Sequence, residues 1–363
     1  MQSIAIIGGG IIGLSIGWQL ARENMSVHIF DQRHAGKQAS WSAAGMLSPY
    51  CEAVYGHLKA LQIGKQSLSL YPSFLKELSE DSNIVLPKES EGTLCVAINR
   101  DDREWLQRQY IFKKKNGMPV YWLSGEEARQ REPLLSPRVN SAIWIPSERQ
   151  INNHLLIEAL KEAFIARGGT LAEKTKITEL LGKDGNNSLK IQAENGQSYC
   201  ANIVINTAGA WANQIDPSLI CQGMNIRPIK GQLLNLKMPS HLLLKGMIRT
   251  PRIYLAPKQD NIVRVGATSE DQGFNEDITA GATLELLENA WEIIPAISEY
   301  KVEEINIGLR PVTANHMPLI GTSSLKGIYH AIGHGRSGIL LAPYTAYLIK
   351  KLITKDHSDA SST

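Results

Sequence analysis

Near its N-terminus the chain reads Gly8-Gly9-Gly10-Ile11-Ile12-Gly13, directly after the apolar residues 4–7. Apolar residues in succession predict a strand buried on both faces, and residues 12–22 predict a helix. The stretch between them fits the G-x-G-x-x-G pattern in its required context. There the first glycine allows a tight turn, the second lets backbone approach a pyrophosphate, and the third lets helix pack on strand. We therefore predict that these residues form the phosphate-binding turn of a dinucleotide site.

Asp31 is placed to complete such a site. Residues 26–31 predict the second strand of a βαβ unit, and Asp31 stands at the end of that strand. A carboxylate there accepts hydrogen bonds from a ribose, while the N-terminus of the preceding helix favours phosphate. The motif does not distinguish a nicotinamide dinucleotide from a flavin dinucleotide.

Two later segments favour a flavin. Residues 204–210 form an apolar strand that runs into a turn of small residues, as does the strand beneath the cofactor in flavoproteins of this type. Residues 333–339 form a second glycine-rich turn before an apolar helix. Its N–H groups are placed to face the flavin N1/O2 edge, where negative charge develops on reduction. The alternative for this turn is an ordinary helix N-terminus without a ligand.

Length, charge and cysteine spacing bound the class of protein. A chain of 363 residues is longer than a single hydrophobic core usually serves, so two domains are predicted. The net charge of +3 gives no reason to expect a nucleic-acid or anionic-membrane partner. The 4 cysteines lie far apart, so neither a disulfide framework nor a metal site is expected. No apolar run reaches the roughly 18 residues of a membrane span and no signal peptide pattern is present, so we expect a cytoplasmic protein.

Periodicity and turn signals place the other main elements. Helices are predicted where apolar residues recur at helical spacing or where a glycine pair ends such a run. Asn195-Gly196 lies between strand-like runs and predicts a hairpin, and a second antiparallel pair is predicted on either side of residues 259–261. The predicted helices cover residues 67–78, 101–116, 155–164 and 340–352. No low-complexity linker separates them, so the two domains are expected to be woven together by several chain crossings.

Ordered motifs over residues 1–349 resemble the glycine/D-amino-acid oxidase family of flavoproteins. Within that family the chain is most similar to the glycine oxidases of thiamine biosynthesis. The matching segments are residues 8–13, 42–49 with Glu52, 265–271, 308–311, 318–321 and 333–343. Several ordered motifs are more specific than any one of them alone. Three departures affect the expected shape of the substrate pocket: Gly335 stands where an aromatic residue is common, Ser337 where asparagine is common, and Asn306-Ile307 where Trp-Ala is often found.

The resemblance implies an α/β fold in which a Rossmann-type FAD-binding domain is interwoven with an α+β substrate domain built on an antiparallel sheet. The expected FAD-binding domain is discontinuous and comprises residues 1–50, 145–215 and 306–353. The expected substrate domain comprises residues 51–144 and 216–305, and residues 354–363 are expected to form a flexible tail. FAD is expected to bind non-covalently, since no cysteine lies near Arg310 or after it. The resemblance also implies a homo-oligomer, frequently a tetramer.

The implied activity is the oxidative deamination of glycine, and of small amines such as sarcosine or D-alanine, by FAD and O2. The products would be an imine or glyoxylate, ammonia and H2O2, with iminoacetate passing to thiazole synthase as product acceptor. One alternative is a related flavin amine oxidase or dehydrogenase that acts on a D-amino acid, sarcosine or proline. Another is a flavoprotein in which the flavin is structural or acts on a protein chain.

Four residues are expected to contact the substrate. Arg310 stands between an apolar strand and Pro311, where a guanidinium can hold a carboxylate bidentately. The alternative for Arg310 is an internal carboxylate partner. The resemblance places the hydroxyl of Tyr254 on the same substrate carboxylate, although a half-buried sheet tyrosine is the alternative from pattern alone. Arg336 is expected to contact substrate or flavin or to close the entrance, and Met46 is expected beside the flavin ring and the substrate, with core packing as its alternative.

The cofactor is expected to contact residues from segments distributed over most of the chain. His334 is expected to form a helix cap or a flavin contact rather than to act as a general base. The full expected cofactor set is Gly8, Gly10, Ile11, Ile12, Gly13, Asp31, Gln32, Ala39, Ser40, Ala44, Gly45, Met46, Ile177, Ala208, Gly209, His334, Gly335, Arg336, Ser337, Gly338 and Ile339.

Overall fold

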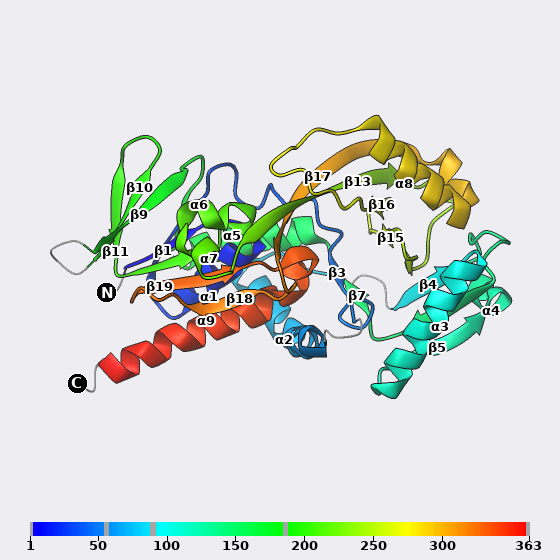
Figure 1. Ribbon diagram of the computed structural model, residues 1–363, viewed down its shortest axis with the longest axis horizontal. Coiled ribbons are helices and arrows are strands. Elements are labelled where there is room, and N and C mark those ends of the chain that lie inside the picture. The colour runs from blue at the N-terminus through cyan, green and yellow to red at the C-terminus, as the bar shows by residue number, and fades with distance from the viewer. Residues whose placement is uncertain (1–2, 54–57, 88–91, 184–187, 361–363) are drawn as a thin grey trace.

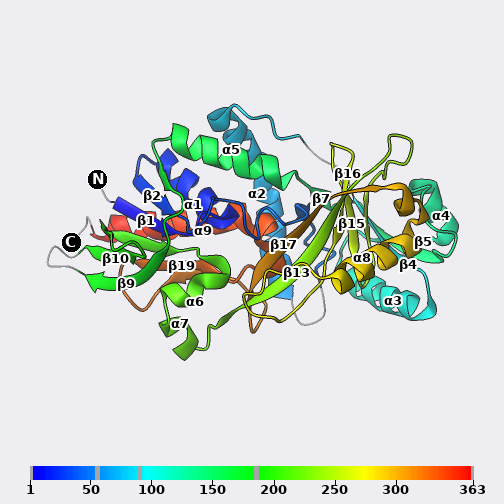
Figure 2. The ribbon, with the colours of Figure 1, turned by 90° about the horizontal axis from the view of Figure 1, so that it is seen from above.

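The computed structural model describes residues 3–53, 58–87, 92–183 and 188–360. A six-stranded sheet of order β18-β19-β12-β1-β2-β8 forms one half of the molecule, on the left of Figures 1 and 2. Its strands are parallel except for the antiparallel edge strand β18. The strands are β1 (Ser3–Ile7), β2 (Ser26–Phe30), β8 (Thr170–Ala172), β12 (Ile203–Asn206), β18 (Leu319–Thr322) and β19 (Ile328–Ile332). This sheet confirms the predicted Rossmann-type unit.

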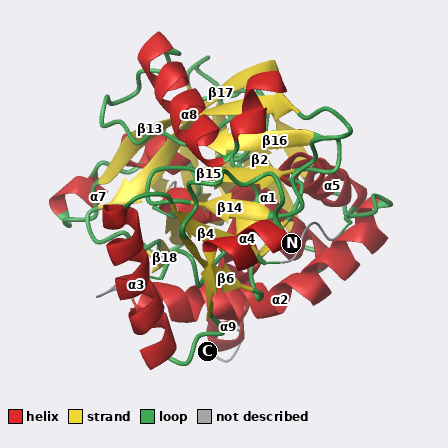
Figure 3. Cartoon of the chain, turned by 90° about the vertical axis from the view of Figure 1, so that its right-hand side faces the viewer, coloured by secondary structure: helices red, strands yellow, loops and turns green. Residues whose placement is uncertain are grey.

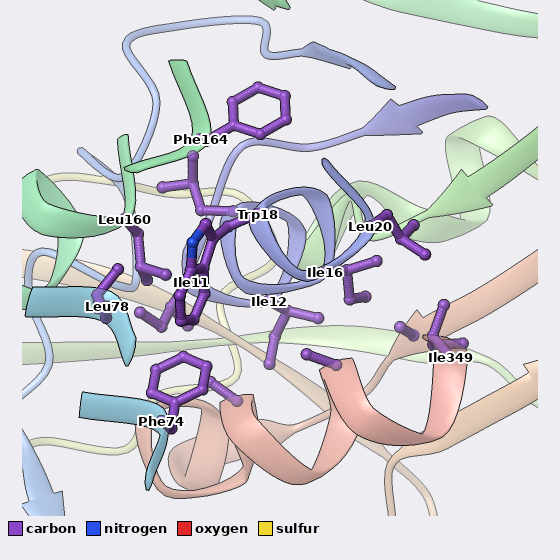
Figure 4. Close-up of a cluster of buried hydrophobic side chains, with 14 of the residues drawn as sticks. Ile11, Ile12, Ile16, Trp18, Leu20, Phe74, Leu78, Leu160, Phe164 and Ile349 are labelled. Carbon is purple, nitrogen blue, oxygen red and sulfur yellow. The ribbon is translucent and has the colours of Figure 1, made fainter. Parts of the chain in front are cut away.

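The core of this half surrounds helix α1 (Ile11–Arg22), all of which is buried apart from Gln19 and Arg22. Trp18 lies edge-on to Phe74, with ring centroids 5.0 Å apart. Figure 4 shows these rings among Ile16 and side chains from α2, α5 and α9. Fully burying a large apolar side chain stabilises the fold by roughly 1.5–3 kcal/mol, so this cluster anchors α1 rigidly on the sheet. The three surrounding helices are α2 (Leu58–Ser82), α5 (Asn153–Ala166) and α9 (Gly338–Ala360).

An eight-stranded sheet of order β17-β13-β16-β15-β14-β4-β6-β5 forms the other half. Its pairs are antiparallel except that β14 and β4 run parallel. Figure 3 looks toward this half, with α8 (Ala280–Ile293) in front of the strands and α3 (Arg100–Lys115) to one side. Its strands are β4 (Thr93–Ala97), β5 (Tyr121–Ser124), β6 (Ser141–Ile145), β13 (Ile226–Lys237), β14 (Met247–Arg249), β15 (Tyr254–Pro257), β16 (Ile262–Gly266) and β17 (Lys301–Thr313). The long pair β13–β17 reaches from the first half into the second (Figures 1 and 2).

Smaller elements complete the chain. There is also a three-stranded sheet of order β11-β10-β9 and a two-stranded sheet β3-β7, and short helices connect the larger elements. The strands are β3 (Met46–Leu47), β7 (Arg149–Gln150), β9 (Ile177–Lys183), β10 (Leu189–Ala193) and β11 (Ser198–Ala201). The helices are α4 (Gly125–Arg131), α6 (Ala212–Ile215), α7 (Ser218–Cys221) and three 3-10 turns, η1 (Gly209–Trp211), η2 (Pro295–Glu299) and η3 (Gly335–Ser337). The predicted Asn195-Gly196 turn joins β10 to β11.

The packing of α2 differs from the expected domain division. Residues 51–144 were expected in the substrate domain, yet Tyr71, Phe74 and Leu78 of α2 pack in the core around α1. Apolar residues on one face of α2 require a partner, and α5 and α9 provide it. Strand β17 also crosses the expected boundary at residue 306, and α9 continues to Ala360 through much of the expected tail. Residues 361–363 of that tail lie outside the described residues.

None of the described helices combines the length and the apolar character that crossing a bilayer demands.

Candidate active site

A cavity of about 750 Å³ lies between the two large sheets. It is lined by the loops after β1, β2 and β12, by β3, by the strands that carry Tyr254 and Arg310, and by the turn before α9. Every expected cofactor and substrate residue lines it except Gly13. Segments far apart in sequence therefore meet around a single space.

The glycine turn leaves no room for side chains. Gly8 has a φ of +108°, and a Cβ there would lie 2.5 Å from the carbonyl oxygen of Thr207. A Cβ on Gly13 would lie 2.0 Å from the carbonyl oxygen of Gly8. Gly13 therefore acts as the third glycine of the pattern was expected to act, by allowing α1 to pack against the turn.

Asp31 and Ser40 hold this turn in shape. The Asp31 carboxylate accepts hydrogen bonds from the backbone N–H of Gly9 and from that of Arg33, both at 2.8 Å. The N–H of Ile11, which was expected to be open to a phosphate, donates to Ser40 Oγ at 2.9 Å. Asp31 is thus part of the turn as well as a lining residue of the cavity.

His334 begins the second glycine-rich turn. It occupies the N-cap position of η3, but its side chain makes no capping hydrogen bond there; instead its Nε2 lies 3.0 Å from Thr345 Oγ1 on α9. Burial lowers the pKa of His334 to about 3. A neutral imidazole held by a hydroxyl is consistent with a packing role in the cavity wall.

Arg310 and Tyr254 project from one face of the eight-stranded sheet, each above a glycine. A Cβ on Gly231 would lie 2.2 Å from an Nη atom of Arg310, and a Cβ on Gly266 would lie 2.4 Å from the Tyr254 hydroxyl. Gly266 stands directly opposite Tyr254 in the β15–β16 ladder. The two glycines let both side chains lie flat against the strands, so their polar ends meet at the cavity.

The Arg310 guanidinium is half-buried in the cavity wall. Nη1 donates to the carbonyl oxygen of Thr268 at 2.9 Å, and among the described residues no carboxylate lies within ion-pair distance of it. Burial lowers the pKa of Arg310 from its ordinary value and raises the pKa of Tyr254. An arginine remains cationic even so, and the phenol remains a donor at neutral pH. Together they present a positive charge and a hydroxyl to an anion.

An ion-pair cluster beside them was not predicted from the sequence. Glu52 Oε1 lies 2.6 Å from Arg249 Nη1, and Glu52 Oε2 lies 3.4 Å from Arg336 Nη1. Burial alone would raise the pKa of Glu52, but the charges of Arg249 and Arg336 outweigh it and lower that pKa. The available signals were the place of Glu52 in a family motif and a charge at Arg249 within an apolar strand. All three side chains line the cavity, with Arg336 the most exposed of them.

A glycine turn on a parallel sheet, joined by one cavity to a half-buried guanidinium without an acidic partner among the described residues, is typical of a dinucleotide-dependent oxidoreductase. The family model for FAD dependent oxidoreductases matches residues 3–352. The chain therefore belongs to this family, and FAD is its cofactor.

Individual relatives are similar over the whole chain. Glycine oxidase from Geobacillus kaustophilus is 30% identical over 97% of this chain and 93% of its own. The crystal structure of glycine oxidase from that organism superposes with a TM-score of 0.90 at 30% identity, covering 98% of this chain and 95% of the other. The bifunctional protein ThiO/ThiG of Trichormus variabilis is 32% identical over 99% of this chain, which spans 53% of that protein.

Proposed function

We propose that the protein catalyses the FAD-dependent oxidative deamination of glycine and similarly small amines. The observation that carries this proposal is Arg310: a half-buried cation with no acidic partner among the described residues, beside a phenol in the wall of a dinucleotide cavity. A charge withdrawn from water is costly unless it is paired, and a substrate carboxylate would pair this one when the ligands fill the cavity. The similarity to glycine oxidases supports an amino acid as the bearer of that carboxylate.

The residues present fit FAD. The Gly8–Gly13 turn and Asp31 would hold the pyrophosphate and ribose, since the three successive glycines at its start carry no side chain. Small residues, Ala39, Ala44 and Gly45, are among those that line the cavity, and they leave room for a flat ring. We propose that the binding is non-covalent. When bound, FAD supplies the acceptor for the two electrons that leave the substrate α-carbon.

The chain's own residues set the geometry of the reaction. Arg310 forks onto the substrate carboxylate, and the Tyr254 hydroxyl donates to the same group, so the α-carbon is held in one orientation. The substrate amine must be neutral before an imine can form. For glycine the overall balance is glycine, water and O2 giving glyoxylate, ammonia and H2O2. Iminoacetate precedes glyoxylate in this balance.

Substrate size tests the proposed function. If Met46 and Tyr254 both border the α-carbon, little volume remains for a side chain. We expect glycine and sarcosine to be the best substrates, D-alanine to be weaker, and D-phenylalanine to be poor. L-amino acids should fail, because with amine and carboxylate fixed an L side chain takes the place from which the hydrogen must leave.

Steady-state kcat/KM for glycine, sarcosine, D-alanine, D-proline and D-phenylalanine, followed by oxygen consumption, measures this order. A preference for D-phenylalanine would overturn glycine as the substrate and would favour a related amine oxidase. Gly335 is the feature that such a result would implicate, because it stands where an aromatic ring is common in the family.

Asp31→Ala should weaken FAD binding. The variant loses the hydrogen bonds from Gly9 and Arg33 as well as a charge-assisted bond to ribose. We expect a loss of about 1.5–3 kcal/mol in FAD affinity, measured by flavin fluorescence on titrating the apoprotein. Asp81→Ala, which removes a carboxylate remote from the cavity, is the matched control. An unchanged FAD affinity in Asp31→Ala would remove Asp31 from the cofactor site.

The proposal extends to assembly and product transfer. We propose a cytoplasmic homotetramer, as in much of the resembling family, in which iminoacetate passes to thiazole synthase. The alignment with the bifunctional ThiO/ThiG protein supports this transfer. Sedimentation analysis of the purified holoprotein tests the oligomeric state.

A further inference from the structure

Two thiols face one another beside the Glu52–Arg249 ion pair: Cys51 precedes Glu52 in the chain, and Cys95 stands opposite Arg249 in the β14–β4 pair. The Sγ atoms of Cys51 and Cys95 are 3.6 Å apart, although 44 residues separate them in the chain. Cys95 is 7% exposed, and Cys51 is half-buried. The two other cysteines, Cys200 and Cys221, are exposed.

Neighbouring groups fix this arrangement. The N–H groups of Tyr50 and Cys51 both donate to Glu148 Oε1 at 2.9 Å, and the buried Lys113 Nζ donates to the carbonyl oxygen of Ala53 at 2.9 Å. The turn that carries Cys51 is therefore held on both sides of that residue. Cys95 is held by strand β4, where it stands directly opposite Arg249.

The surroundings also favour a reactive sulfur. The Cys51 thiol as hydrogen-bond partner, followed by the charges of Arg249 and Lys113, lowers the pKa of Cys95 against the effect of burial. A thiolate is the nucleophilic form of cysteine, and nearby cations are the usual means of stabilising it. The second thiol lies where a resolving cysteine must lie.

We propose that Cys51 and Cys95 form a peroxide-sensitive thiol pair that closes into a disulfide and thereby adjusts the substrate end of the cavity. A thiolate attacks one oxygen of H2O2: an S–O bond forms, the O–O bond breaks, and the departing hydroxide takes the thiol proton to become water. The second sulfur then attacks the first: an S–S bond forms, the S–O bond breaks, and a second water leaves. Two thiols are oxidised and one peroxide is reduced.

The expected consequence reaches the site through Glu52. A disulfide holds its sulfurs about 2.05 Å apart, so the turn and β4 must approach each other. Glu52 follows Cys51 directly and pairs with Arg249 and Arg336, which line the cavity. Since a displacement of about 1 Å can lower turnover substantially, we expect kcat/KM for the best substrate to fall by about tenfold in the cross-linked protein.

The direct test treats reduced holoprotein with H2O2, alkylates the remaining thiols, and maps peptides by mass spectrometry without reduction. The expected result is a peptide pair that links Cys51 to Cys95, lighter by two hydrogens and separated by dithiothreitol. Recovery of both residues as alkylated thiols, or as sulfinic and sulfonic acids without a linked pair, would overturn the proposal. This arm does not depend on the proposed function, because the peroxide is added.

Cysteine variants distinguish a specific Cys51–Cys95 cross-link from non-specific oxidation of the protein. Cys51→Ala should form no cross-link and should leave a Cys95 sulfenic acid that dimedone traps, while Cys221→Ala should keep the cross-link. Peroxide should lower kcat/KM reversibly in the parent and in Cys221→Ala but leave it unchanged in Cys51→Ala. A cross-linked parent with the kcat/KM of the reduced protein would remove the link to the site.

A final arm identifies the source of the oxidant and rests on the proposed function. Turnover of glycine in air should produce the same cross-link, and added catalase should prevent it. If turnover yields no peroxide while added peroxide still forms the cross-link, the proposed function fails and the thiol pair stands. If turnover yields peroxide and neither arm forms the cross-link, the thiol pair fails and the proposed function stands.

Discussion

Arg310→Ala is expected to weaken the stabilisation of the transition state for glycine oxidation by about 3–5 kcal/mol, which is observed as a lower kcat/KM. This is the range for removing one partner of an ion pair that is shielded from water. The variant removes the guanidinium that stands without an acidic partner among the described residues, and it leaves a substrate carboxylate uncompensated in the cavity. FAD content should stay at the parental level, because Arg310 lies at the substrate end rather than at the glycine turn. Steady-state kinetics together with the flavin-to-protein absorbance ratio measure both quantities.

Arg310→Lys is the matched variant. An ammonium keeps the charge but cannot fork onto a carboxylate, so we expect only part of the activity to return. If Arg310→Ala and Arg310→Lys both oxidise glycine like the parent while retaining FAD, Arg310 is not the carboxylate-binding residue.

Gly231→Ala is expected to reproduce much of this loss without touching a charged group. The new Cβ would lie 2.2–2.5 Å from three atoms of the Arg310 guanidinium, which must then leave its place. A displacement of about 1 Å at a positioning group can cost about 10²-fold, and we expect a loss of that order in kcat/KM. The measurement is kcat/KM for glycine at full FAD occupancy.

Gly321→Ala provides the control, because it is also a strand glycine but a Cβ there meets nothing within 4 Å. We expect it to keep the parental kcat/KM. A Gly231→Ala enzyme as active as Gly321→Ala would show that the guanidinium does not need its place above Gly231.

Much of the parallel half of the fold could be predicted from the sequence because its signals are local. The glycine turn, the strands before and after it, and Asp31 lie within one short stretch, and their patterns depend on neighbouring residues only. The same holds for the Asn195-Gly196 hairpin and for the turn before α9.

Long-range pairing could not be predicted in the same way. The register that sets Gly231 near Arg310 joins β13 to β17, and nothing in the sequence around Gly231 indicates which side chain lies above it. Arg249 looks like a charge at the end of a short strand until β14 is paired with β4 and β15. The place of α2 in the first core likewise depends on the helix it meets rather than on its own periodicity.

The residues expected to bind the substrate could be predicted in part: their identities from the sequence, but not their mutual arrangement. Arg310 was indicated by its own place in the sequence as well as by the family resemblance, Tyr254, Arg336 and Met46 mainly by the resemblance, and the structure brings all four to one cavity. Glu52 and Arg249 complete the same end of the cavity, yet a sequence shows only that such charges exist. Their mutual pairing is a property of the folded chain.

The most direct test of the account is the visible absorption spectrum of the purified protein before and after anaerobic addition of glycine. We expect a yellow protein whose flavin absorption band is bleached by glycine without oxygen and restored by air, and whose FAD is released into solution on heat or acid denaturation. A flavin band that persists after anaerobic glycine and sarcosine would contradict it.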